Sequence, residues 1–379
     1  MRQISLVILI IALFQFSSLF SQEEKVLEYK NDNPYETVQL KEQSYFKKKP
    51  KNIIFLIGDG MGVSQVYAGL TANRGELNIT NMPITGFSQT QSATDYVTDS
   101  AAGGTALATG QRTYNDALAV DLDTVPIPTI LEISNQNGYA TGLVSTSSIT
   151  HATPASFIAH QASRSMTEEI AADFLEVDID VFIGGGYQFF ADRKDNRNLI
   201  SELEAKNYKV FRDLKDAEST NSGKLAVLTA DDHNPAYPER GEMLPDATEK
   251  AINILKNNKK GFFLMVEGSM IDWGGHNNDT KFIVLETLDF DRAVAKALEF
   301  ASTNKETLVV VTADHETGGM SIEGGCIKEG VVKANYTTGN HSAVMVPVFA
   351  YGAGAQKFSG VYNNTDVFNK MIEAFGFKK

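Results

Sequence analysis

The chain has 379 residues, of which 42% are hydrophobic, enough to bury the core of one large α/β domain or of two smaller ones. Its formal net charge of −13 argues against nucleic acid and against anionic membrane surfaces as partners. A negatively charged substrate would therefore need a local positive centre, which a bound metal ion could supply. The single cysteine, Cys326, excludes a disulfide within the chain.

The first 22 residues predict a signal peptide. Arg2 is followed by an apolar stretch, residues 4–14, and then by a mixed stretch in which cleavage is expected near Gln22. The apolar stretch is short for a membrane span, so a retained anchor is the less favoured interpretation. We expect export to a periplasm or to the outside of the cell, with no membrane anchor after the signal is removed.

A polar arm is expected between this signal and the folded domain. Residues 23–49 end in a lysine-rich run and predict a mostly solvated arm before a catalytic domain at 50–379. Residues 52–57 are a continuous apolar run, typical of a central parallel strand, and Asp59 follows them between two glycines. Glycines let the backbone approach a ligand closely, although in isolation an ordinary Asp-Gly turn is the simpler interpretation.

The segment Thr98-Asp-Ser-Ala-Ala-Gly-Gly-Thr105 predicts the start of a helix of small residues. Asp99 or Ser100 could cap the N-terminus of this helix, which is the simpler role. Alternatively, Ser100 could be a nucleophile, because the dipole at a helix N-terminus favours an anion. The residues alone leave both interpretations open.

Another strand is expected at 139–146, and a histidine and a proline follow it. Pro154 suits the first turn of a helix that would carry His160 and Arg164. His151 and Arg164 could equally be surface residues or functional ones, whereas His160 is expected to pack against its surroundings.

The next part of the chain contains one more expected strand, at 178–183, and then becomes polar. Residues 190–249 contain charged runs, loops with proline and only short apolar pieces. We expect this segment to be a peripheral excursion in which His233 is solvated.

The next expected strand, and the helical turn after it, carry potential metal ligands. The apolar run 261–267 ends in Glu267, and Asp272 and His276 follow four residues apart, on one face of a helical turn. A long helix is expected at 282–300.

The run 307–311, rich in β-branched residues, predicts a buried strand that leads directly to Asp314 and His315. His341 precedes one more expected strand, at 346–351, and residues 367–375 predict an amphipathic helix.

Taken together, these segments carry four carboxylates and three histidines. In open α/β sheets, ligands bind at the carboxyl ends of the strands, and carboxylate with imidazole suits zinc. Two clustered metal ions are the simplest explanation, and two-metal sites favour phosphoryl displacement. The seven residues are Asp59, Glu267, Asp272, His276, Asp314, His315 and His341.

Four motifs, in this order, closely resemble those of the alkaline phosphatases, and the match extends from Lys51 to Phe375. The resemblance implies a three-layer α/β/α sandwich around a largely parallel sheet, usually as a homodimer, that hydrolyses small phosphate monoesters. The motifs are Gly58-Asp-Gly-Met-Gly62, Thr98-Asp-Ser-Ala-Ala-Gly-Gly-Thr105, Glu267-Gly-Ser-Met-Ile-Asp272 with His276, and Thr312-Ala-Asp-His-Glu-Thr-Gly-Gly319.

The resemblance also implies roles for single residues. Ser100 would be the nucleophile rather than a mere cap, and would form a covalent phosphoserine. Arg164 falls where the family has its phosphate-binding arginine, whose fork matches two phosphate oxygens. The implied ligand sets are Asp272, His276 and His341 for one zinc, Asp59, Asp314 and His315 for the second zinc, and Asp59, Thr153 and Glu267 for magnesium.

Two positions depart from the best-known enterobacterial pattern. His151 and Trp273 stand where that pattern has Asp and Lys, and they resemble the pair in some marine bacterial members. A histidine supplies no negative charge beside magnesium, so the exchange predicts a weaker third metal site.

Two alternative functions remain. A sulfatase or phosphodiesterase of the same superfamily would be expected to use another nucleophile motif, such as Cys-x-Pro-x-Arg or Thr, and neither occurs at position 100. The other alternative, a catalytically silent zinc-binding protein, is disfavoured because the ligand set is accompanied by Ser100 and Arg164.

Overall fold

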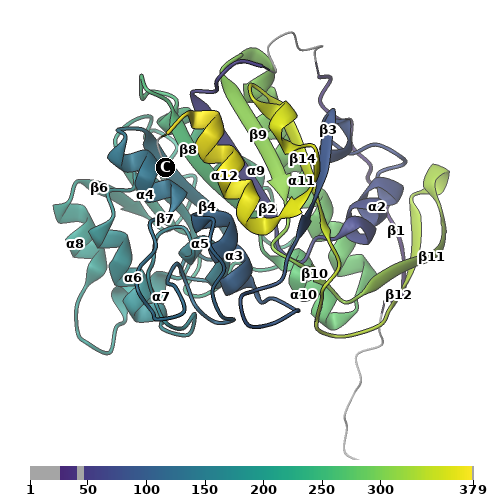
Figure 1. The fold of residues 1–379 in the computed structure, drawn as a ribbon, viewed down its shortest axis with the longest axis horizontal. Coiled ribbons are helices and arrows are strands. Elements are labelled where there is room, and N and C mark those ends of the chain that lie inside the picture. Colours follow the sequence, from purple (N-terminus) through teal and green to yellow (C-terminus); the bar gives the residue numbers. More distant parts are fainter. Residues whose placement is uncertain (1–25, 41–46, 378–379) are drawn as a thin grey trace, which may run out of the picture.

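A computed structural model describes residues 26–40 and 47–377 and has one large central sheet (Figure 1). Across the sheet, the ten strands follow in the order β15 (Gly360–Asn363), β3 (Ile84–Gln89), β14 (Val346–Gly352), β9 (Thr307–Thr312), β2 (Asn52–Gly58), β8 (Phe262–Gly268), β4 (Ala140–Ser148), β5 (Val181–Gly185), β7 (Lys224–Leu228) and β6 (Tyr208–Phe211). β14 runs antiparallel to both of its neighbours, and the other neighbouring strands are parallel. The predicted, largely parallel sheet is confirmed.

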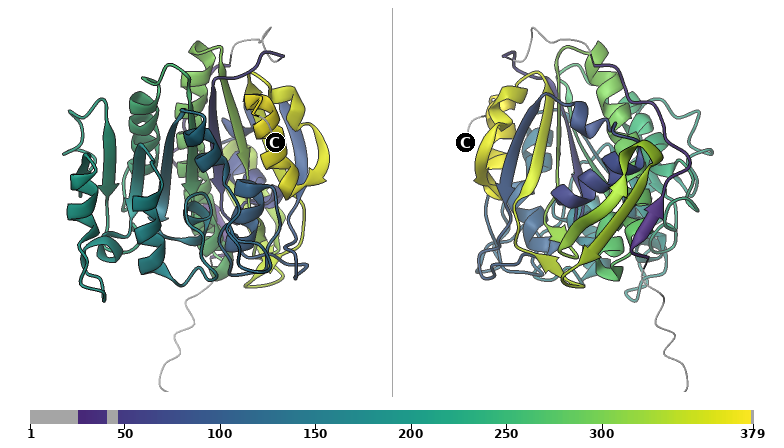
Figure 2. Two further views of the ribbon diagram at one scale, coloured as in Figure 1. Left: turned by 60° about the vertical axis from the view of Figure 1, so that its left-hand side comes forward. Right: turned by 90° about the vertical axis from the view of Figure 1, so that its right-hand side faces the viewer.

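Helices cover both faces of this sheet, because successive side chains of a strand point to opposite faces. In β2, Ile54 and Leu56 belong to one hydrophobic cluster, whereas Ile53 and Phe55 belong to the other. The layers are visible from two further sides in Figure 2. The first cluster includes α2 (Val63–Ala72), α9 (Met243–Leu255) and α11 (Thr280–Thr303), and the second includes α3 (Ser100–Thr109), α4 (Ile130–Gln136), α6 (Thr167–Glu176), α7 (Tyr187–Ala191), α8 (Leu199–Ala205) and α12 (Asn364–Phe375). This confirms the three-layer α/β/α sandwich.

The segment 190–249 is more than the peripheral excursion expected from the sequence. It supplies α8, β6 and β7, and most of α9, so it extends the central sheet and one of the helical layers. β7 is almost fully buried between its neighbours, which explains how a short apolar run in a polar segment becomes part of the core. The sequence predicts a peripheral segment here because the loops around these elements are polar.

The described part of the N-terminal arm, residues 26–40, packs on the domain, although most of its residues stay exposed or partly exposed. β1 (Glu28–Lys30) pairs with β12 (Val331–Tyr336), which in turn pairs with β11 (Met320–Cys326). Further along the arm, Tyr35 donates a hydrogen bond from its hydroxyl to Asp291 of α11 at 2.7 Å. The predicted signal peptide, residues 1–22, lies outside the described residues.

No helix in the described ranges is long and apolar enough to cross a membrane.

The helix expected to carry His160 and Arg164 is not formed. α5 (Ala152–Ala155) ends after a single turn, and both residues lie in the chain that follows it. There the backbone pairs with an earlier segment instead: Leu118 and Gln161 exchange two hydrogen bonds, and Arg164 N–H donates to the carbonyl of Asp116 at 2.7 Å. This tertiary pairing outweighs the helix signal of Pro154.

Candidate active site

Four adjacent strands at the centre of the sheet bring the candidate residues to one edge. β9, β2, β8 and β4 are neighbours and run parallel, so their carboxyl ends meet. The candidate residues in or directly after these strands are Asp314 and His315 for β9, Asp59 for β2, Glu267 for β8, and His151 and Thr153 for β4.

Two shorter elements complete the edge. Asp272 and His276 lie on α10 (Met270–Asn277), which begins directly after β8. His341 arrives from far along the sequence, because β13 (His341–Ser342) pairs with β10 (Glu316–Thr317) next to His315. The structure therefore brings all seven strand-end residues together, as the sequence predicts.

Asp272 is the centre of the first group. One of its carboxylate oxygens lies 3.3 Å from His276 Nε2, and the other lies 3.4 Å from His341 Nε2. Asp272, His315 and His341 also offer one ligand atom each within 4.8 Å of one another. His315 therefore faces this group in addition to the three residues that the family resemblance implies.

His315 is also the centre of the second group. Its Nε2 lies 3.4 Å from an oxygen of Asp59 and 3.4 Å from an oxygen of Asp314. The His315 and His341 rings are stacked with their centroids 3.5 Å apart, so the first two groups are contiguous.

Asp59 links the second group to a third. Asp59, His151 and Glu267 offer ligand atoms within 4.8 Å of one another, and the hydroxyl of Thr153 donates to Asp59 at 3.2 Å. Thr153 thus lies beside Asp59, and His151 belongs to the same group.

The carboxylates of this site fit bound cations. Buried oxygens of Asp59, Asp314 and Glu267 have no hydrogen-bond partner among the described residues. Burial and the neighbouring carboxylates raise the pKa of Asp59 well above its ordinary value and the pKa of Asp314 to about 7. A cation between the carboxylates would relieve both the desolvation and the repulsion.

The histidines fit the same interpretation. Nδ1 of His276 lies 2.8 Å from the carbonyl of Gly339, and Nδ1 of His341 lies 2.8 Å from the carbonyl of Thr98. Because a carbonyl only accepts, each Nδ1 carries a proton, and each Nε2 faces the cluster, where it could bind a metal ion. A histidine held through its second nitrogen in this way is typical of a metal ligand.

A group of buried hydroxyls orients Glu267. The Ser145 hydroxyl donates to Oε2 of Glu267 at 2.6 Å, and the hydroxyls of Ser147 and Ser269 lie 2.8 and 3.0 Å from that of Ser145. These serines occupy one carboxylate oxygen of Glu267, so the unpartnered Oε1 is left for the third group.

The structure separates the two roles that the sequence left open for Ser100. Asp99 is the N-cap of α3, because its Oδ1 accepts from the backbone N–H of Ala102 at 2.9 Å. Ser100 is the first residue of the helix, and its Oγ lies 3.3 Å from Nε2 of His315. The Ser100 hydroxyl is therefore directed at the cluster and is not needed as a cap.

Asp99 also holds Arg164. Its Oδ2 accepts from Nη1 of Arg164 at 3.3 Å and from the backbone N–H of Asp116 at 3.0 Å. The second terminal nitrogen, Nη2, donates to Nε2 of His151 at 3.1 Å. Each of these Arg164 nitrogens keeps another N–H for a ligand.

His151, Trp273 and His233 form a wall beside Arg164, which we call the aromatic wall. Burial, together with Arg164 and His233 nearby, lowers the pKa of His151 to about 3, so this imidazole is neutral. The expectation that His233 is solvated is only partly correct, because its side chain is 32% exposed but its ring packs 4.9 Å from that of Trp273. No sequence pattern predicts this contact, because an isolated histidine in a polar loop has no periodicity to place it.

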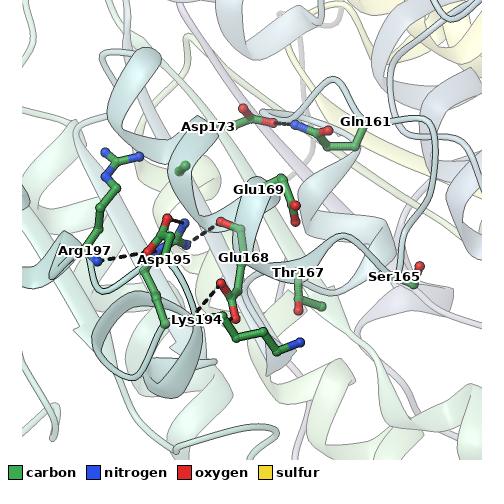
Figure 3. A pocket seen from close by; sticks show the side chains of 11 residues that line it. Gln161, Ser165, Thr167, Glu168, Glu169, Asp173, Lys194, Asp195 and Arg197 are labelled. Carbon is green, nitrogen blue, oxygen red and sulfur yellow. Dashed lines mark hydrogen bonds and ion pairs between the residues drawn. The ribbon is translucent and has the colours of Figure 1, made fainter.

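A surface groove along α6 is lined by Gln161 and by Ser165, close to Arg164 in the sequence (Figure 3). Its polar groups largely pair with one another: Gln161 donates to Asp173 at 2.8 Å, and Arg193 pairs with Asp195 at 2.5 Å. None of the candidate metal ligands lines it. We therefore assign the chemistry to the cluster at the strand ends.

Comparison with known proteins agrees with this assignment. A family model described as alkaline phosphatase matches residues 50–335. Alkaline phosphatase 4 of Bacillus subtilis (strain 168) is 36% identical, over 88% of this chain and 91% of its own length. The alkaline phosphatase of Escherichia coli (strain K12) is 34% identical, over 87% of each chain.

A solved structure gives the same result. The alkaline phosphatase from the Antarctic bacterium TAB5 has a TM-score of 0.84 and 41% identity, covering 88% of this chain and 100% of its own. A variant of that enzyme, with a histidine replaced by aspartate, has magnesium bound in its M3 site.

The family model spans most of the chain, and the relatives are similar over nearly their whole length. The three groups of potential ligands supply the metal-binding cluster. The chain therefore belongs to the alkaline phosphatase family and is a metal-binding hydrolase of phosphate monoesters.

Proposed function

We propose that the chain hydrolyses phosphate monoesters through a covalent phosphoserine on Ser100, at a site for two zinc ions and one magnesium ion. The observation that carries this proposal is the position of the Ser100 hydroxyl. It lies at the N-terminus of α3, is relieved of capping by Asp99, and is 3.3 Å from Nε2 of His315.

The metals are proposed on the chemistry of the donors. Carboxylate oxygen and imidazole nitrogen suit zinc, whereas the all-oxygen set suits magnesium. When bound, the ions would stabilise negative charge on the attacking and leaving oxygens and make water more acidic. The proposed ligands are Asp272, His276 and His341 for one zinc, Asp59, Asp314 and His315 for the other, and Asp59, Thr153 and Glu267 for magnesium.

The first chemical step belongs to Ser100. Its deprotonated Oγ attacks phosphorus, the bond from phosphorus to the ester oxygen breaks, and the departing alcohol oxygen takes up a proton. The dipole of α3 favours the anionic oxygen at its N-terminus. Because α3 is a ten-residue buried helix, this oxygen is held on a rigid element.

The second step releases phosphate. Water attacks phosphorus in line with the Ser100 oxygen, the phosphorus–oxygen bond to Ser100 breaks, and inorganic phosphate leaves as the hydroxyl is restored. Throughout, the free N–H groups of Arg164 are proposed to bind two phosphate oxygens, with Asp99 and His151 fixing the guanidinium from behind.

The third metal site is proposed to hold magnesium weakly. His151 lies in the group that contains Asp59 and Glu267, and it contributes a neutral imidazole where a carboxylate would attract magnesium. The magnesium in the aspartate variant of the TAB5 enzyme supports the idea that such an exchange matters at a third site.

The cellular context of the enzyme is also a proposal. Export to a periplasm or beyond the cell, without an anchor after signal removal, rests on residues 1–22 of the sequence. A homodimer rests on the family resemblance alone. The net charge of −13 supports small phosphate monoesters, rather than nucleic acid, as partners.

The test is acid quenching of the zinc- and magnesium-loaded enzyme during turnover of a monoester labelled with radioactive phosphate. We expect label on Ser100, and we expect Ser100→Ala to keep its fold and zinc content while losing label and nearly all turnover. The exposed Ser359→Ala is the matched control and should behave as wild type. Faster hydrolysis of a diester or a sulfate ester than of the monoester, or turnover with no label on Ser100, would refute the proposal.

A further inference from the structure

His233 reaches the aromatic wall from a loop that joins β7 to α9. The backbone N–H of Ser148, at the end of β4, donates to Nδ1 of His233 at 3.0 Å. Nδ1 therefore accepts, and the ring proton sits on Nε2, which lies 3.5 Å from a carboxylate oxygen of Asp232. The ring orientation is thus fixed by the strand that also leads to His151.

The three rings of the aromatic wall support one another. The His233 ring centroid lies 4.9 Å from that of Trp273 and 5.5 Å from that of His151, with interplanar angles of 80° and 86°. His151 and Trp273 are 6.4 Å apart at 81°. Such edge-to-face distances and angles are favourable for aromatic pairs.

This wall is coupled to Arg164 through His151. Nε2 of His151 accepts from Arg164, whereas its buried Nδ1 has no hydrogen-bond partner among the described residues. Hydrogen bonding therefore holds the His151 ring at one nitrogen only. Its tilt depends on the rings that pack against it, and His233 is the nearer of the two.

We propose that His233 is a positioning residue for phosphate: its ring fixes His151 and Trp273, and His151 in turn fixes the guanidinium of Arg164. This inference rests on the proposed phosphate-binding role of Arg164. His233 touches no reacting atom in this scheme, so its loss weakens the binding of phosphate groups and leaves the metal ligands and Ser100 in place.

The loop itself is held by bonds that do not involve the His233 ring. The carbonyl of Ala230 accepts from the backbone N–H of Gly186 at 3.1 Å. The buried side chain of Asn234 donates to the carbonyl of Thr146 at 3.1 Å. A substitution at His233 therefore removes the ring while leaving the path of the loop anchored on both sides.

Three variants distinguish the effect of losing the His233 ring from the effect of disturbing the loop. His233→Ala removes the ring, and His233→Phe keeps a ring of similar size while losing the acceptor for Ser148. Asp231→Ala is the loop control, because its side chain is 74% exposed and pairs with Arg212 on the surface. Each metal-loaded variant is assayed for KM and kcat with p-nitrophenyl phosphate, for the inhibition constant of inorganic phosphate, and for metal content.

Trp273 is the only tryptophan of the chain, so intrinsic fluorescence reports directly on the aromatic wall. For His233→Ala we expect a shift of the emission maximum and a rise of about three- to tenfold in both KM and the phosphate inhibition constant, as expected from losing one or two aromatic pairs. Metal content should be unchanged. His233→Phe should recover most of the affinity, and Asp231→Ala should match wild type.

Comparison with Arg164→Ala distinguishes this inference from the proposed function. If Arg164→Ala weakens phosphate binding and His233→Ala does not, the positioning role fails while the proposed function stands. If Arg164→Ala itself leaves phosphate binding unchanged, the proposed role of Arg164 fails as well. In the Arg164→Ala background, His233→Ala should add little, and full additivity of the two losses would overturn the inference.

Discussion

Arg240, on the loop that carries His233, allows the contribution of a buried ion pair to the free energy of unfolding to be tested. Its guanidinium is 1% exposed and pairs with Glu286 and Asp289 of α11, whose side chains are 1% and 0% exposed. It donates to Glu286 Oε1 at 2.8 Å and to Asp289 Oδ2 at 2.6 Å. Arg240→Met removes this cation and leaves two carboxylates buried beside each other.

The expected cost follows from this burial. Removing one partner of a buried ion pair costs about 3–5 kcal/mol, because a charge is left without compensation. The exposed pair of Arg197 and Glu202, with side chains 44% and 39% exposed, provides the matched control. Arg197→Met should cost about 0–1 kcal/mol, since solvent already screens that pair.

The pH dependence gives a second measurement on the same variant. Burial raises the pKa of Asp289 to about 6, even with Arg240 alongside. A raised carboxyl pKa contributes stability that is complete below the unfolded value of 3.8 and is lost as the pH rises through about 6. The destabilisation of Arg240→Met should therefore be larger at about pH 8 than at about pH 5.5.

Urea unfolding of the metal-loaded proteins, followed by circular dichroism, measures both quantities. Adding Asp289→Asn to Arg240→Met should restore part of the stability, because it removes one of the uncompensated charges. A loss for Arg240→Met no greater than that for Arg197→Met, or a loss that does not change with pH, would refute the reasoning.

Three further predictions concern metals and an ion pair. Removal of the metals with a chelator should lower the melting temperature, because the buried carboxylates then repel one another; an unchanged value after verified zinc loss, in a calorimetric scan, would contradict this. Ser145→Ala should weaken magnesium binding by about tenfold in a metal titration, because Glu267 loses its 2.6 Å hydrogen bond; the exposed Ser359→Ala should have no effect. His160 and Glu132, whose atoms lie 3.0 Å apart, should show a coupling of about 1–2 kcal/mol in a double-mutant cycle with His160→Gln and Glu132→Gln. Burial opposes both charges, but their hydrogen bonds raise the pKa of His160 and lower the pKa of Glu132. The coupling should therefore be present from about pH 5 to 6 and disappear as the pH rises through the raised pKa of His160. A coupling that persists at about pH 9 would contradict this.

The strand-end motifs were the most predictable part of the molecule. Each follows a continuous apolar run, and the carboxyl ends of parallel strands share an edge, so Asp59, Glu267 and Asp314 could be placed together without coordinates. Adjacency of β9, β2, β8 and β4 then confirmed the cluster.

The parts that could not be predicted depend on contacts between distant segments. The chain after Pro154 does not continue as a helix, because Gln161 pairs with Leu118. The sequence around neither residue predicts this pairing. The position of His233 likewise depends on the backbone of Ser148, 85 residues earlier. Local periodicity contains no information about either contact.

Asp99 constrains how substrate preference could diverge in this enzyme. One carboxylate caps the helix of Ser100 and also binds Arg164, so a single residue positions the proposed attacking oxygen and the proposed phosphate-binding guanidinium relative to each other. The phosphoryl group that this pair is proposed to hold is the same in every monoester. Adaptation to a new alcohol would therefore have to leave this pair unaltered and change residues outside it.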